Sequence, residues 1–66
     1  MQITIYVVTV KTQSKTFPKV KTFTDYKKAE DYAVNEADKI NAEGHRDGYE
    51  LRFNNQASES VMLTIH

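Results

Sequence analysis

Cysteine is absent from this 66-residue sequence, and the chain has only two glycines, one proline and two histidines. The lack of cysteine excludes disulfides and thiolate metal sites, and two histidines are too few for a histidine-based metal centre. We therefore expect no metal ion or other cofactor. A single α+β domain over residues 1–66 buries only about 60% of the surface that its unfolded chain exposes. Its stability must come from a well-packed apolar core, self-association or a bound partner.

Long apolar runs are also absent. No stretch approaches the roughly 20 apolar residues that a membrane-spanning helix requires. Met1 leads directly into a strand pattern, without the basic and apolar segments of a secretory signal. A chain without cysteine is compatible with a reducing compartment. We expect a cytoplasmic protein that does not contact a membrane.

Residue arrangements that catalyse reactions are missing as well. The two glycines, Gly44 and Gly48, do not form a phosphate-binding loop. The serines lie in polar segments with no histidine placed to activate them. The run His-Arg-Asp at 45–47 is the one acid–base cluster, and we interpret it as a solvated loop. We therefore expect a binding protein and not an enzyme.

The formal net charge is zero, but the two halves of the chain carry opposite charges. Residues 1–29 contain six lysines and one aspartate, a net charge of +5. Residues 30–66 contain three basic and eight acidic residues, a net charge of −5. This asymmetry predicts an electric dipole, which can orient a charged partner even though the total charge would not attract one.

Four segments have the composition of β-strands. Residues 2–11 are apolar on both faces, as expected for a central strand or for one with a bulge. Residues 17–24 contain Pro18, which cannot donate a ladder hydrogen bond, so we expect an edge strand. Residues 49–54 and 61–66 alternate between apolar and polar side chains, as half-buried strands do.

Residues 25–43 predict the one helix, with Asp25 as its N-cap and Gly44 as its left-handed stop. One apolar stripe follows the helical period: Tyr26, Ala29, Ala33, Ala37 and Ile40. The order β-β-α-β-β predicts an α+β two-layer sandwich, in which the helix packs on one face of a four-stranded, mostly antiparallel sheet. A central first strand gives the sheet order 2-1-3-4, with the second and third strands parallel and joined by a right-handed crossover.

Three surfaces are candidates for binding a partner. The first is the basic hairpin, whose lysines and aromatic ring could contact a phosphate backbone and stack on bases. Its residues are Lys11, Lys15, Phe17, Lys19 and Lys21. The alternative is an edge strand with protective lysines, which we favour because the domain is not basic overall.

The second candidate is the acidic helix face, which we expect to comprise Glu30, Asp31, Asp38 and Glu43. Acidic residues along a rigid helix could occupy the basic groove of a nucleic-acid enzyme, as phosphate-mimicking inhibitors do. The alternative is an ordinary solvated helix face.

The third candidate is the sheet face that a single helix leaves uncovered. Its residues would be either Ile3, Ile5 and Val7 or Tyr6, Val8 and Val10, together with Met62 and Thr64. An exposed apolar sheet face favours a protein interface or a homodimer, unless a bulge turns these side chains inward.

The segment Phe23–Ala33, FTDYKKAEDYA, follows a predicted hairpin and precedes two predicted strands. In this arrangement the chain resembles small early proteins of bacteriophages, compact α+β domains that bind and inhibit host enzymes. The resemblance implies a phage or mobile-element protein that acts in the host cytoplasm. We therefore expect a protein that modulates a host nucleic-acid enzyme or defence component through the acidic helix face or the open sheet face. A small nucleic-acid-binding module that uses the basic hairpin is the alternative.

Overall fold

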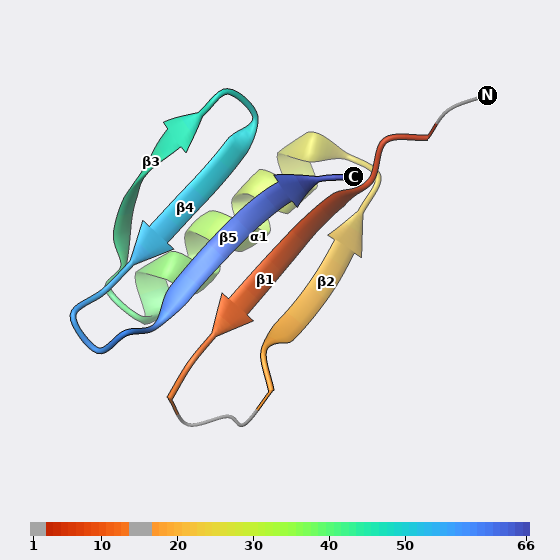
Figure 1. Cartoon of the computed structure of the whole chain (residues 1–66). Coiled ribbons are helices and arrows are strands. Elements are labelled where there is room, and N and C mark those ends of the chain that lie inside the picture. The colour runs from red at the N-terminus through yellow and green to blue at the C-terminus, as the bar shows by residue number, and fades with distance from the viewer. Residues whose placement is uncertain (1–2, 14–16) are drawn as a thin grey trace.

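The computed structural model describes residues 3–13 and 17–66, which form one five-stranded sheet with one helix on one of its faces (Figure 1). The α+β class, with a single helix, is therefore confirmed. In chain order the elements are β1 (Tyr6–Lys11), β2 (Lys19–Phe23), α1 (Tyr26–Lys39), β3 (Glu43–Asp47), β4 (Glu50–Asn54) and β5 (Ser60–Ile65).

The sheet order is β2-β1-β5-β4-β3, and every neighbouring pair is antiparallel. The predicted order 2-1-3-4, with its parallel crossover, is wrong. The helix carries the chain across the sheet to the far edge, and the β3–β4 hairpin then brings the chain back inward. As a result β5 enters between β4 and β1. Its alternating apolar side chains suit this central position, where Val61 and Leu63 are fully buried.

The structure contains a fifth strand, β3, where we expected the end of the helix and a loop. Its sequence, EGHRD, has no large apolar residue and no alternation, so neither strand signal is present. All five of its residues are exposed, and the strand is held by its pairing with β4 and by the ion pair of Arg46 with Glu30 of α1. A two-residue turn joins the two strands, and Gly48 takes the positive φ of 65° that such a turn requires.

The helix begins where the sequence predicts and ends earlier. Asp25 is the N-cap, and its Oδ1 accepts a hydrogen bond from the N–H of Lys27 at 2.9 Å. The last helical residue is Lys39, and Asn41 takes the left-handed conformation that we had assigned to Gly44. Asparagine tolerates this conformation better than most residues. Gly44 therefore does not end the helix and lies within β3 instead.

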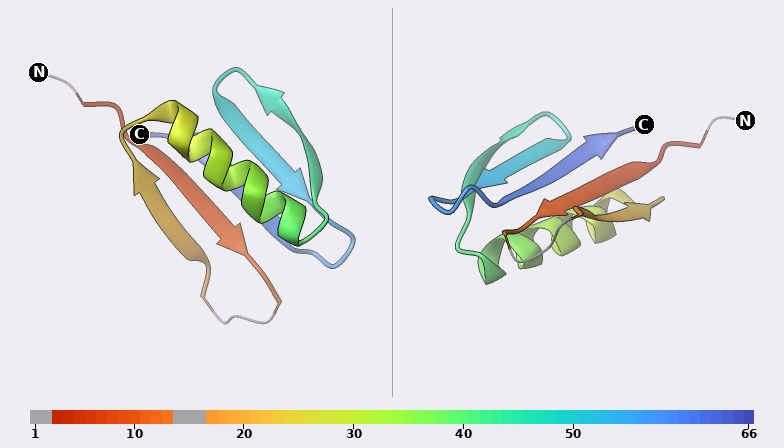
Figure 2. Two further views of the ribbon diagram at one scale, coloured as in Figure 1. Left: turned by 180° about the vertical axis from the view of Figure 1, so that it is seen from behind. Right: turned by 60° about the horizontal axis from the view of Figure 1, so that its bottom comes forward.

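The predicted alanine stripe forms the helix side of the core. Ala29, Ala33 and Ala37 are buried, and α1 lies along β1 and β5, as the view from behind shows (Figure 2). Small side chains allow the helix axis to approach the sheet closely. The sheet contributes five buried residues to this core: Val8, Val10, Leu51, Val61 and Leu63. Half-buried aromatic and aliphatic side chains surround it.

Within the described residues, no helix is both long enough and apolar enough to span a membrane.

Gly44 is required because β3 and β4 approach closely at this position. A Cβ on residue 44 would overlap the backbone carbonyl oxygen of Arg52. We expect Gly44→Ala to lower the free energy of unfolding by about 1–3 kcal/mol, as overpacking does elsewhere. Gly48→Asn is the control, because nothing lies within 4 Å of a Cβ there and its cost is the backbone strain of the positive φ alone, which asparagine tolerates better than most residues. Urea denaturation measures the free energy of unfolding of both variants. An equal decrease in the two would contradict the requirement for glycine at residue 44.

Candidate binding surfaces

The predicted acidic helix face is divided between two elements. Glu30, Asp31 and Asp38 lie on α1, but Glu43 lies on β3, so its assignment to the helix is wrong. The side chain of Glu30 is only 16% exposed and forms an ion pair and hydrogen bond with Arg46 of β3. This acid therefore ties the helix to the edge of the sheet and does not project toward a partner.

The outward side of α1 carries mixed charge. Lys27 lies 3.9 Å from Glu30 and 4.0 Å from Asp31, measured between its Nζ and their carboxylate oxygens. The exposed charged residues of the helix are three lysines and two aspartates: Lys27, Lys28, Asp31, Asp38 and Lys39. A partner would therefore meet an ordinary solvated helix surface with no excess of negative charge.

The lysines of the basic hairpin point to both sides of the sheet. Lys19 and Lys21 pair with Val10 and Val8, whose side chains face the helix. Lys11 has the opposite orientation, because side chains alternate along a strand. Phe17 is 79% exposed, and Lys15 lies outside the described residues. The described lysines Lys11, Lys19 and Lys21 therefore do not combine into one basic surface for a nucleic acid.

Lys19 and Lys21 gather around Tyr32 at the edge of the helix side. Their ammonium nitrogens lie 5.7 and 5.0 Å from the centre of the Tyr32 ring, within the range of cation–π attraction. The Tyr32 hydroxyl is buried and has no hydrogen-bond partner of normal geometry in the described part of the chain. This neighbouring hydroxyl raises the pKa of Lys19, and Glu36, at 3.6 Å, adds to the effect. Within the described ranges, Lys21 has no acidic side chain within ion-pair distance.

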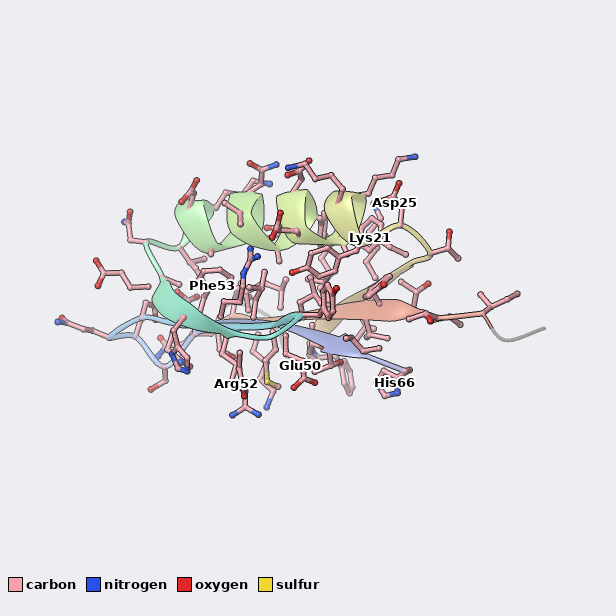
Figure 3. The ribbon with its side chains drawn as sticks, turned by 90° about the horizontal axis from the view of Figure 1, so that it is seen from above. Lys21, Asp25, Glu50, Arg52, Phe53 and His66 are labelled. Carbon is pink, nitrogen blue, oxygen red and sulfur yellow. The ribbon has the colours of Figure 1, made fainter. Side chains whose placement is uncertain are left out.

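The face of the sheet that α1 leaves uncovered, here called the open sheet face, has an apolar half and a charged half. The strand registers place its side chains in order from β2 to β3. The apolar half lies on β2, β1 and β5 and contains Ile5, Val7, Val20 and Met62, with Thr9, Thr22 and Thr64 between them. The charged half lies on β4 and β3 and contains Glu43, His45, Asp47, Glu50 and Arg52. Figure 3 shows Glu50 and Arg52 on this side and Lys21 on the helix side.

The open sheet face matches one of the two sets that the sequence offered. Ile5 and Val7 lie on it with Met62 and Thr64, whereas Val8 and Val10 are buried under the helix. Sequence reasoning did not assign Val20 to this face, although it is 56% exposed. Its position between two lysines, in a segment of alternating side chains, was the available signal. The register of β2 also places Val20 beside Thr9 of β1.

An open depression of about 480 Å³ lies between the end of α1 and the β4–β5 turn. Its Asn55 is already engaged: Nδ2 donates to Ile40 O at 2.8 Å and to Glu59 Oε1 at 3.0 Å. Its Oδ1 accepts from the N–H groups of Ala57 and Glu59. Asn55 thus joins the turn to the helix, and no group of three metal-ligating side chains occurs among the described residues.

Comparison with known proteins adds no relative: no family model matches this chain, and neither the curated proteins nor the solved structures contain a significant match.

Tyr26 connects the helix to the β3–β4 hairpin, with ring centroids 5.3 Å from Tyr6 and 5.2 Å from Tyr49. Burial is the main cause that raises the pKa of Tyr26 above its ordinary 10.0. The folded state thus holds the phenolic proton of Tyr26 more tightly than the unfolded chain does. It also holds the ammonium proton of Lys19 more tightly, because the pKa of Lys19 is raised as well. This stabilisation is complete below pH 10 and is lost as the pH rises through the raised pKa values.

We therefore expect the free energy of unfolding to fall as the pH rises above about 10, and to fall less steeply in Tyr26→Phe. Urea titrations between about pH 9 and about pH 11.5 measure both slopes. Tyr49→Phe is the control, because that residue is 64% exposed. Parallel curves for the parent protein and Tyr26→Phe would contradict the role given to Tyr26.

Proposed function

We propose that this chain is a non-catalytic binding protein whose contact surface is the open sheet face and whose partner is another protein. The observation that carries the proposal is the apolar half of that face. Val20 of β2, Ile5 just before β1, and Met62 of β5 are 56%, 39% and 37% exposed. Contiguous apolar side chains at the centre of a surface, with charged side chains along one border, have the composition of a protein interface.

A protein partner suits this surface better than a nucleic acid does. Single-stranded nucleic acids bind to sheets through aromatic side chains on which the bases stack. In residues 3–13 and 17–66, six of the seven aromatic side chains lie on the helix side or at its border, and the seventh, Phe17, precedes β2. The open sheet face thus offers bases no tyrosine or phenylalanine ring, and its imidazoles are those of His45 and His66. The separation of the hairpin lysines onto two sides weakens the nucleic-acid alternative further.

The class of partner follows from the resemblance to phage early proteins, which favours a host protein such as a nucleic-acid enzyme or a defence component. Glu43, Asp47 and Glu50 border the apolar half on the β3–β4 side, with Arg52 and His45 between them. A partner with apolar side chains at the centre and basic ones toward β3 would complement this face. The helix, with its mixed charges, contributes less than the sequence suggested.

A single charge in the apolar half tests the proposal. We expect Met62→Lys to weaken binding to the partner at least about tenfold, because a lysine there would be desolvated without an acid opposite it. Val34→Lys is the matched control: Val34 is 40% exposed, against 37% for Met62, but lies on the outward side of α1. Host proteins captured by the parent chain and by each variant are compared by quantitative mass spectrometry.

A protein retained by the parent chain and by Val34→Lys, but lost by Met62→Lys, supports the proposal. Equal loss with both variants contradicts it. Anisotropy titrations with a single-stranded oligonucleotide at about 50 mM and about 200 mM salt examine the alternative. Tight binding that weakens steeply with salt and is unchanged by Met62→Lys would replace the proposal with a nucleic-acid function.

A further inference from the structure

The backbone hydrogen bonds of β1 determine which groups of its neighbour β2 remain free. Ile5 and His66 exchange two backbone hydrogen bonds: Ile5 N–H donates to His66 O at 3.0 Å, and His66 N–H donates to Ile5 O at 2.7 Å. Residues along an antiparallel strand bond alternately to the neighbour on either side. Odd-numbered residues of β1 therefore bond to β5, and even-numbered residues bond to β2.

The free edge of β2 follows from this alternation. The three even-numbered residues of β1 lie opposite Lys19, Lys21 and Phe23, whose backbone groups therefore bond to β1. The N–H and C=O groups of Val20 and Thr22 then point away from the sheet. They form a row of two donors and two acceptors, to which an additional strand can pair.

The side chains beside this row differ between the two faces. On the helix side, Lys19 and Lys21 flank the half-buried ring of Tyr32, and Lys21 has no acidic partner among the described residues. On the open sheet face, Val20 and Thr22 continue the apolar half described above. An added strand would thus meet positive charge on one face and an apolar and a hydroxyl side chain on the other.

A second copy of the chain cannot use this edge symmetrically. Antiparallel pairing of two β2 edges through Val20 and Thr22 places Lys21 directly opposite Lys21 of the other copy. Like charges opposite one another destabilise a strand pair. The lysines therefore oppose self-pairing and favour a segment of opposite charge.

We propose that the edge of β2 binds an extended segment of the partner protein as an additional strand, with acidic side chains at alternate positions. Its backbone pairs with Val20 and Thr22, its acids face Lys19 and Lys21, and its intervening side chains extend the apolar half of the open sheet face. This inference rests on the proposed function, since it gives the chemistry of the same partner. The binding site then extends from the open sheet face around the edge of the sheet.

A labelled peptide of about nine residues that alternates glutamate with valine is the direct probe. Its control has the same composition with the glutamates grouped together. We expect Lys21→Glu to weaken binding of the alternating peptide at least about fivefold, because it replaces attraction by repulsion. Lys28→Glu makes the same change of charge on the helix and is expected to leave the affinity within about twofold.

Backbone pairing is tested by Val20→Pro. The N–H of Val20 points away from β1, so proline removes a donor for the partner without breaking a bond inside the sheet. Pro18 already occupies the equivalent position two residues earlier. We expect Val20→Pro to lose peptide binding, and Val20→Ala, which keeps the N–H, to retain most of it. Circular dichroism and urea denaturation of both variants show whether the fold is intact.

Amide hydrogen exchange gives a readout that does not depend on substitution. In the free protein, we expect the amides of Val20 and Thr22 to exchange fast and those of Lys19, Lys21 and Phe23 to exchange slowly, because only the latter bond to β1. Added peptide should slow Val20 and Thr22 selectively.

Equal affinity for the alternating and grouped peptides, or no change at these two amides, would overturn the inference. So would self-association of the chain that protects the same amides, because a second copy would then occupy the edge. If capture of the partner fails in Met62→Lys but survives in Val20→Pro and Lys21→Glu, the edge inference is wrong and the proposed function stands.

Discussion

The close contact between three helix alanines and the centre of the sheet is the interaction on which the rest of this structure depends. Ala29, Ala33 and Ala37 bring α1 down onto β1 and β5, where Val8 and Leu63 are fully buried. The buried side chains are all alanine, valine or leucine, so the core is thin. Aromatic rings surround it on the helix side and complete the burial. This requirement leaves the apolar half of the open sheet face with aliphatic and hydroxyl side chains and without tyrosine or phenylalanine.

Electrostatics in the folded chain differs from what the opposite charges of its two halves suggest. Acids of the helix are used to hold the edges of the sheet: Glu30 pairs with Arg46 of β3, and Glu36 pairs with Lys19 of β2. The Glu36–Lys19 pair joins the acidic half of the sequence to the basic half, whereas Glu30 and Arg46 both belong to the acidic half. The charge that remains available to a partner is local. It includes Lys21, beside the half-exposed Lys19, at one edge and the acidic residues of β3 at the other.

The sequence predicted the parts of the fold that depend on local signals. Asp25 is recognisable as an N-cap, and the alanine stripe is visible because its spacing matches the helical period. β3 has no such signal, since its strand character comes from pairing with β4. Gly44 looked like a helix stop, but it is needed for the approach of Arg52. The position of β5 depends on contacts between distant parts of the chain, which no local pattern records. Local alternation was enough to name Ile5 and Met62 as surface candidates. The free edge at Val20 could be identified only from the register of β2 with β1.

The pairing of β1 with β5 has a consequence for how the chain reaches this structure. Tyr6 lies opposite Ile65, so the two ends of the sequence meet in the middle of the sheet. Contacts of such long sequence separation slow folding, because the entropy of closing the loop must be lost first. During synthesis, the β1–β2 hairpin and the helix are made before β5. The position between β1 and β4 stays unfilled until residues 60–65 have emerged. The sheet is therefore incomplete until residues 60–65 are available, and the apolar side chains of β1 need protection from aggregation until then.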